Sequence, residues 1–155
     1  MSGEWLPPHQ PNCLGCGPEN PAGLGMRMRQ EGERVLGEVT LDSRHEGAPG
    51  YAHGGAVTTA LDDAIGMLLF VLRRPAVTAK LEVNFRRPAF IGRPFEIEAW
   101  VEQIEGRKLH LRSEMRDEGE TVAEAIALFL EVDVEHFAEG ARRSPEADRH
   151  KQVPW

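Results

Sequence analysis

The chain has 155 residues and a net charge of −7, from 18 basic against 25 acidic side chains. This length predicts one domain with a single sizeable core. The acidic balance, without a basic block, argues against a nucleic-acid-binding protein. Two cysteines are too few for a disulfide framework, and the polar, proline-rich start is unlike a signal peptide. We therefore expect a cytoplasmic location.

The first part of the chain changes character twice. Residues 1–23 are rich in glycine and proline, so we expect a loop segment there. Two short strands are predicted over residues 24–30 and 34–41, joined by a turn at Glu31 and Gly32. A glycine-rich loop then leads into a long apolar helix over residues 54–72, which must end by Arg74 because Pro75 follows.

From residue 76 onward apolar and polar residues alternate, which predicts strands over residues 77–85, 94–102, 107–117 and 121–135. The last of these is rich in Ala, Glu and Leu and could form a helix by propensity alone. A strand is favoured because the segment follows two hairpin-spaced strands and would otherwise leave the sheet with a bare edge. The predicted domain covers residues 24–137, and residues 138–155 are expected to be a charged, poorly ordered tail.

The order of elements predicts an α+β fold. A single helix that is apolar nearly all round needs to be wrapped rather than laid on a surface. A curved antiparallel sheet around that helix meets this requirement and leaves a broad face for a second copy. Asp62 and Asp63 lie in the middle of the helix, where a membrane span would tolerate them least, so no membrane partner is expected.

Small and polar residues form a stripe along the predicted helix. Gly55, Thr59, Asp62 and Gly66 are spaced by four, three and four residues and therefore share one face. Such a stripe on a buried helix is typical of a substrate channel. Asp63 points about 100° away from it. The alternative is that both aspartates are hydrogen-bonded in an ordinary core or dimer interface.

Two features favour a functional role for the aspartates. Mid-helix aspartate has poor helix propensity and is costly to bury, so a pair of them in an apolar run needs a reason. In addition, the helix starts with His53, Gly54 and Gly55, whose backbone N–H groups and helix dipole suit a developing oxyanion. A carboxylate two turns further along the helix would complete a site for acyl-transfer chemistry.

The segments AHGGAVTTALDDAIG and VTAKLEVNFRRPAFIG resemble the hotdog-fold acyl-CoA thioesterases, in particular the phenylacetyl-CoA thioesterase-like branch. The resemblance covers about residues 13–135. It implies a hotdog fold and hydrolysis of an acyl-CoA to a carboxylic acid and free CoA, with no metal or cofactor. It also implies a homodimer, or a dimer of dimers, whose active site is shared between two subunits.

The resemblance assigns roles to individual positions. Asp62, nine residues after His53, would be the nucleophile or the general base that activates water. The backbone N–H groups of Gly54 and Gly55 would polarise the thioester carbonyl, and His53 would shape the loop and contact the substrate. Thr78 would hold the water or the carboxylate. Thr59 and Asp63, on and beside the polar stripe, are expected to contact the substrate.

One position departs from the pattern of the resembled branch. Several relatives carry an Asn or Gln upstream of the histidine as a second donor to the carbonyl. Six residues before His53 stands Gly47, which has no side chain to donate. His45 is the candidate to replace it.

The pair Cys13-x-x-Cys16 has the spacing of half a zinc or redox site. A structural zinc site needs four ligands, and His9 is the only near candidate for a third. A glycine-rich loop packed near the substrate entrance fits the segment better, and a similar cysteine loop recurs in the resembled branch. We therefore expect no metal.

Arg86, Arg87 and Arg93 cluster around the end of one predicted strand and the following turn. Coenzyme A carries several phosphate charges, and an acidic protein needs local cations to hold it. The alternative is a solvated strand edge that discourages aggregation. Both interpretations stay open at this point.

Two other functions compete with thioester hydrolysis. The first is a hotdog dehydratase or hydratase acting on acyl thioesters. Such enzymes need a histidine paired with the acid, and His53 lies at the helix start, far along the axis from Asp62. The second is a non-catalytic acyl-CoA-binding protein.

Overall fold

The computed structural model describes residues 3–147. Its strands and helices follow one another in this order: β1 (Glu4–Trp5), β2 (Arg27–Glu31), β3 (Arg34–Thr40), the short 3-10 helix η1 (Ser43–His45), α1 (Gly54–Leu72), β4 (Ala76–Phe85), β5 (Pro94–Glu105), β6 (Lys108–Asp117), β7 (Glu120–Glu131) and α2 (Glu135–Arg143).

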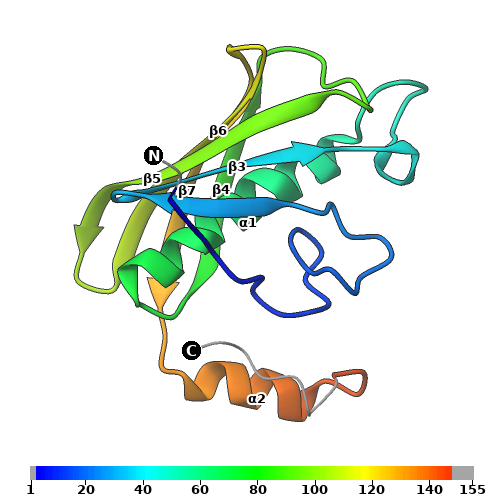
Figure 1. Ribbon diagram of the computed structural model, residues 1–155. Coiled ribbons are helices and arrows are strands. Elements are labelled where there is room, and N and C mark those ends of the chain that lie inside the picture. Colours follow the sequence, from blue (N-terminus) through cyan, green and yellow to red (C-terminus); the bar gives the residue numbers. More distant parts are fainter. Residues whose placement is uncertain (1–2, 148–155) are drawn as a thin grey trace.

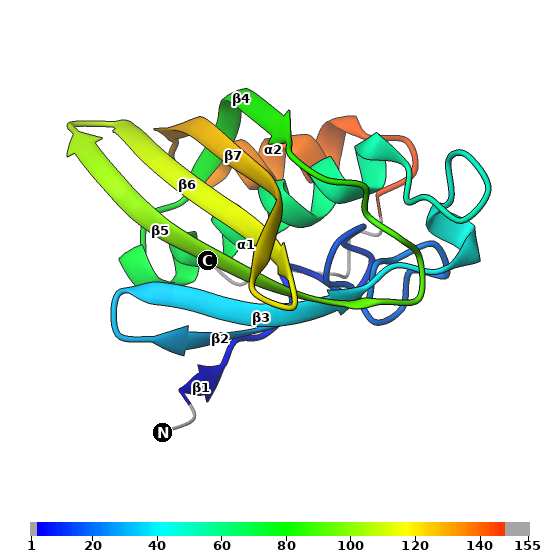
Figure 2. The ribbon, with the colours of Figure 1, turned by 90° about the horizontal axis from the view of Figure 1, so that it is seen from above.

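The strands form one antiparallel sheet in the order β1-β2-β3-β5-β6-β7-β4 (Figure 2). The sheet curves around α1, which lies against its concave face (Figure 1). The expected strands are therefore confirmed, including β7, where helix propensity and strand context disagreed. Its buried positions alternate along the strand and face the helix, because one face of a half-buried strand must be apolar.

Helix α1 is the centre of the core and covers the predicted span. The helix is capped by Arg73, which adopts the left-handed conformation at φ 54° and donates its N–H to the Leu69 carbonyl. Pro75 prevents further helix. By length and composition α1 could cross a membrane, but the sheet wraps it, and Ser113 from β6 donates a hydrogen bond to the Leu61 carbonyl at 3.0 Å. It is therefore a buried core helix.

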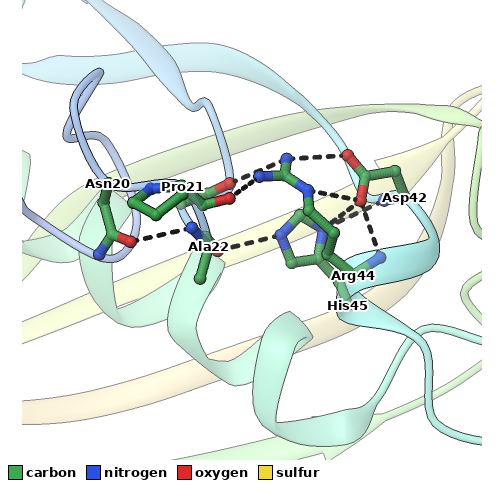
Figure 3. Close-up of polar contacts among 7 residues, drawn as sticks. Asn20, Pro21, Ala22, Asp42, Arg44 and His45 are labelled. Carbon is green, nitrogen blue, oxygen red and sulfur yellow. Dashed lines mark hydrogen bonds and ion pairs between the residues drawn. The ribbon is translucent and has the colours of Figure 1, made fainter.

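The N-terminal segment is more ordered than expected. Residues Glu4–Trp5 pair with β2, and the following loop is tied to η1 by side chains from that short helix. Figure 3 shows the contact: Arg44 donates to the Pro21 carbonyl, and His45 Nε2 lies 3.2 Å from the Ala22 oxygen. His45 Nδ1 accepts from the Asp42 N–H at 3.1 Å. The segment is thus held against the domain rather than hanging from it.

Helix α2 was not anticipated. The sequence led us to expect a poorly ordered tail from residue 138, whereas α2 runs across that boundary and β7 ends at Glu131, earlier than predicted. Glu135 lies in the first turn of α2 and Arg142 in the last, where each charge suits the helix dipole. Arg142 also pairs with Glu135 at 2.5 Å. Residues 148–155 of the expected tail lie outside the described part of the chain.

Candidate active site

Asp62 and Thr78 are brought together from two elements. Asp62 lies in the middle of α1, and Thr78 lies on the edge strand β4. The Thr78 hydroxyl donates to Asp62 Oδ1 at 3.0 Å. The register between β4 and β7 slips between Thr78 and Lys80, so a β-bulge shapes the strand at this point. The predicted contact between these two residues is therefore present.

Asp62 is half-buried, and the environment acts on its ionisation in two directions. Burial raises the pKa of Asp62 above the usual 3.8, while the Thr78 hydrogen bond works to lower it. A base of raised pKa is better matched to proton transfer near neutral pH than an exposed carboxylate is. The hydrogen bond from Thr78 also fixes which oxygen of Asp62 stays free to act.

A pocket of about 290 Å³ opens beside this pair. Its wall includes side chains from five regions of the chain: His9, Asp62, Leu69, Thr78, Phe129 and Phe137. His9 comes from the N-terminal segment and Phe137 from α2, and no role was predicted for Phe137. His9 lies in a segment without apolar periodicity, and Phe137 lies two residues beyond the last predicted strand, so no local pattern assigned either residue to this pocket. The apolar lining suits an acyl group.

The start of α1 offers one free backbone donor. His53 is the N-cap, and its Nδ1 accepts the Gly55 N–H at 2.8 Å. Among the described residues no acceptor faces the Gly54 N–H. The structure therefore corrects the expectation that both glycines offer donors: Gly54 does, and the Gly55 N–H is used by His53. The Thr59 hydroxyl is also engaged, because it donates to the Gly55 carbonyl at 2.8 Å.

His45 is unsuitable as the second carbonyl donor. Its side chain is buried, at 7% exposure, and both ring nitrogens have partners in η1 and the N-terminal loop. An Nδ1 that accepts a backbone N–H requires the proton on Nε2, and that proton points to the Ala22 carbonyl. His45 thus holds the loop in place, which corrects the role suggested by its sequence position.

Gly54 and Asp62 do not belong to one site within a single chain. Asp62 follows Gly54 by eight residues, so the two lie about 12 Å apart along the helix axis, at 1.5 Å per residue. Thr59 lies between them along the helix. A reacting carbonyl held by Gly54 would be out of reach of Asp62 of the same chain.

The three predicted arginines gather near the helix start. A pocket of about 330 Å³ is lined by Gly54, Phe85, Arg86 and Arg87, and a neighbouring one of about 450 Å³ includes Arg87 and Arg93. Each arginine has a carboxylate partner: Arg86 with Glu124 at 2.6 Å, Arg87 with Glu120 at 3.4 Å, and Arg93 with Asp117 at 2.7 Å. All three remain partly exposed, which fits both phosphate contact and a solvated strand edge.

Asp63 points away from the stripe, as the helix geometry predicts, and faces the N-terminal segment. It is 9% exposed, and its Oδ1 lies 3.0 Å from His9 Nδ1 and 3.2 Å from Cys13 Sγ. Burial raises the pKa of Asp63. Burial works to lower the pKa of His9, but hydrogen bonds with Asp63 and Cys13 outweigh it and raise that pKa to about 10. The expected contact of Asp63 with substrate stays a prediction.

The two cysteines join the same contact. A hydrogen bond with Cys16 is the main cause that lowers the pKa of Cys13, to about 3, and the same bond raises the pKa of Cys16. Cys16 Sγ lies 3.3 Å from His9 Nδ1. The segment expected to be a simple entrance loop therefore places two thiols and an imidazole against α1, one residue along from Asp62.

A curved antiparallel sheet around one long helix, with an acid at mid-helix facing the edge strand, defines a hotdog-fold protein. The model of the thioesterase superfamily matches residues 49–124. The acyl-coenzyme A thioesterase THEM4 of Bos taurus is 37% identical over 92 residues, which cover 58% of this chain and 38% of that protein. Over residues 49–124 the chain is therefore similar to the thioesterase superfamily.

Solved structures give the same fold. Protein RHA08564, a thioesterase superfamily protein, has a TM-score of 0.73 and 26% identity, covering 79% of this chain and 60% of that one. The PaaI protein of the E. coli phenylacetic acid degradation operon has a TM-score of 0.66 and 19% identity, covering 71% of this chain and 81% of that one. The chain spans less than half the length of the curated relatives it matches.

Proposed function

We propose that the protein hydrolyses an acyl-CoA thioester to a carboxylic acid and free CoA. The observation that carries the proposal is the Asp62 carboxylate, held by Thr78 at 3.0 Å on the wall of an apolar pocket. The free Gly54 N–H beside Arg86 and Arg87 adds a carbonyl donor next to cations. The THEM4 relatives, which carry acyl-coenzyme A thioesterase in their name, support the substrate class.

The chemistry needs few groups. Asp62 either takes a proton from a water that attacks the thioester carbonyl or attacks that carbon itself and is released by water. In both routes the C–S bond breaks, the sulfur leaves as the CoA thiolate, and the oxygen of water ends in the products' carboxyl group or in Asp62. The Gly54 N–H donates to the oxyanion that forms on the carbonyl.

The distance between Gly54 and Asp62 supports a site shared by two copies of the chain. Strand β4 is at the sheet edge and pairs only with β7 among the described strands, so its other side offers backbone groups to a second chain. A two-fold pairing along this edge would place Asp62 and Thr78 of one copy next to Gly54 of the other. We infer a homodimer, or a dimer of such dimers, on this ground.

The test is release of free thiol from a panel of acyl-CoAs of different chain length and aromaticity. Asp62→Asn keeps the shape of the side chain but removes the base and nucleophile, so kcat should fall at least ~10²-fold. The matched control is Asp133→Asn, an exposed aspartate in the turn before α2, which should leave kcat unchanged. Equal activity of Asp62→Asn and the control would refute the assignment of Asp62.

One observation favours a second candidate. His9 and Asp63 form a histidine–acid pair at 3.0 Å, and both line the pocket that holds Asp62. A hydratase or dehydratase needs such a pair for proton transfer, so the panel includes an enoyl-CoA. Hydration of the double bond without thiol release would replace the thioesterase proposal. Tight CoA binding with neither reaction would identify a binding protein.

A further inference from the structure

Four side chains that commonly bind metals meet at the junction of the N-terminal segment and α1. His9, Cys13 and Cys16 come from the segment, and Asp63 comes from the helix. One ligand atom from each residue lies within 4.8 Å of all the others. The sequence offered only three of these ligands, because Asp63 is fifty residues away from Cys13 and its direction depends on how the segment folds back.

The spacing of these atoms matches that of a tetrahedral zinc shell. Zinc holds sulfur at about 2.3 Å and nitrogen or oxygen at about 2.0–2.2 Å, so neighbouring ligand atoms stand roughly 3.3–3.8 Å apart. Here Cys13 Sγ lies 3.8 Å and Cys16 Sγ 3.3 Å from His9 Nδ1. Asp63 Oδ1 lies 3.2 Å from Cys13 Sγ and 3.0 Å from His9 Nδ1. Only small shifts separate this cluster from a coordinated one.

We propose that His9 Nδ1, Cys13 Sγ, Cys16 Sγ and Asp63 Oδ1 bind one zinc ion in a closed, structural site. Two soft thiolates with an imidazole and a carboxylate favour zinc over magnesium or calcium, which prefer oxygen ligands. Four protein ligands leave no open position for a substrate, so the ion would fix structure rather than take part in catalysis. On binding, the Cys16 thiol and the protonated His9 ring release protons to solvent, whereas Cys13, whose pKa is about 3, binds as the thiolate it already is.

The surroundings of the cluster are those of a metal site. The His9 ring also makes a hydrogen bond to the Gly66 backbone and stacks on Phe70, with 5.4 Å between the ring centroids, so it is held at one edge and on one face. The His9 backbone N–H donates to Cys16 Sγ at 3.3 Å. These contacts orient two ligands before any ion arrives.

Two glycines and an unpaired carboxylate oxygen also support a metal site. A side chain at Gly15 would overlap the Asp63 carboxyl, and one at Gly66 would lie 3.0 Å from His9 Nε2, so both positions let the segment approach α1 closely. Within the described residues Asp63 Oδ2 is buried without a hydrogen-bond partner. A cation at Oδ1 would offset the cost of burying that carboxylate.

The site would fix one wall of the pocket at Asp62. His9 belongs both to the cluster and to that wall. Zinc would clamp this segment onto the helix one residue from Asp62. The proposal concerns metal binding alone, so it stands or fails separately from thioester hydrolysis.

The direct test uses the whole protein, reduced and freed of metal by a chelator, then titrated with Co²⁺ under anaerobic conditions. We expect one Co²⁺ per chain, with the thiolate-to-metal charge-transfer absorption and the intense visible bands of a tetrahedral ion. Zn²⁺ should displace the Co²⁺ and abolish both signals. A folded, fully reduced protein that takes up no stoichiometric metal, or takes it up without thiolate bands, would show that the four side chains form only a hydrogen-bonded network.

Variants identify the ligands. The double change Cys13→Ser and Cys16→Ser should lose stoichiometric Co²⁺ uptake, whereas the control His136→Ala, an exposed histidine of α2, should keep it. Asp63→Asn should weaken binding at least tenfold while keeping the thiolate bands at saturating Co²⁺. Zn²⁺ should raise the Tm of the wild type and of the control but not of the double variant. Unchanged uptake in the double variant would overturn the assignment.

Discussion

The clearest test of a shared active site mixes two inactive variants. The first is Asp62→Asn, which removes the acid. The second is Gly54→Pro, which removes the backbone donor at the start of α1. Gly54 is the first residue of the helix, where proline is tolerated because the missing N–H makes no bond within the helix.

The structure shows that Gly54→Pro should fold. His53, the residue before it, has φ −61° and ψ 136°, the extended conformation that a residue before proline prefers. A Cβ at Gly54 would lie 3.5 Å from the Phe85 ring, an ordinary contact. The control Gly54→Ala fits the same space and keeps the N–H, so it should stay active and separate the loss of the donor from steric effects.

The expected recovery follows from how the two defects combine. If Gly54 of one chain works with Asp62 of the other, a mixed dimer has one site with both defects and one with neither. Random pairing makes about half of the dimers mixed, and half of their sites are intact, so unfolding and refolding the two variants together should restore about a quarter of wild-type activity. The assay is thiol release, with sedimentation to confirm dimers. No recovery in intact mixed dimers would refute the shared site.

Three further changes probe single contacts. Thr78→Val keeps the shape but removes an exposed hydrogen bond to Asp62, about 1 kcal/mol, so kcat should fall about five- to tenfold; an unchanged kcat would remove this contact from the mechanism. Gly15→Ala should destabilise the fold by about 1–3 kcal/mol in urea melts, whereas Gly140→Ala, in open space on α2, should stabilise it slightly. Burial works to raise the pKa of Glu98, but its two arginine partners keep it below 4.5, so its stabilisation is present above pH 4.5 and is lost as pH falls further. The Tm of Glu98→Gln should therefore fall less than the wild-type Tm between neutral and acidic pH, and an equal fall in both proteins would contradict this.

The sequence predicted the sheet and α1 well because their patterns have physical periods. A helix that buries nearly every face, and strands that bury every second residue, leave signals that local reading detects. The contact between Thr78 and Asp62 was predicted from a resemblance rather than from a period. The geometry of this contact depends on a β-bulge beside Thr78, which no local sequence pattern predicts.

The residues that the sequence assigned wrongly lie where the outcome depends on a distant partner. His45 is a plausible donor by position, but its ring is used by η1 and the Ala22 carbonyl. Gly55 has the right backbone for an oxyanion donor, but the His53 ring accepts its N–H first. In both cases a side chain satisfies a polar group within the domain, and such choices follow from three-dimensional proximity that spacing along the chain does not encode.

The two neighbouring carboxylates of α1 contact different partners. Residues one apart on a helix point about 100° apart, so Asp62 faces the edge strand and Asp63 faces the N-terminal segment. Asp62 is half-buried and Asp63 is buried, so each carboxylate loses hydration and needs compensation nearby. Asp62 receives one neutral hydrogen bond, which leaves it reactive. Asp63 receives the His9 ring and, in our proposal, a zinc ion, which makes it inert. Removing the zinc ion should therefore loosen the N-terminal segment beside Asp62 without removing the Asp62 carboxylate itself.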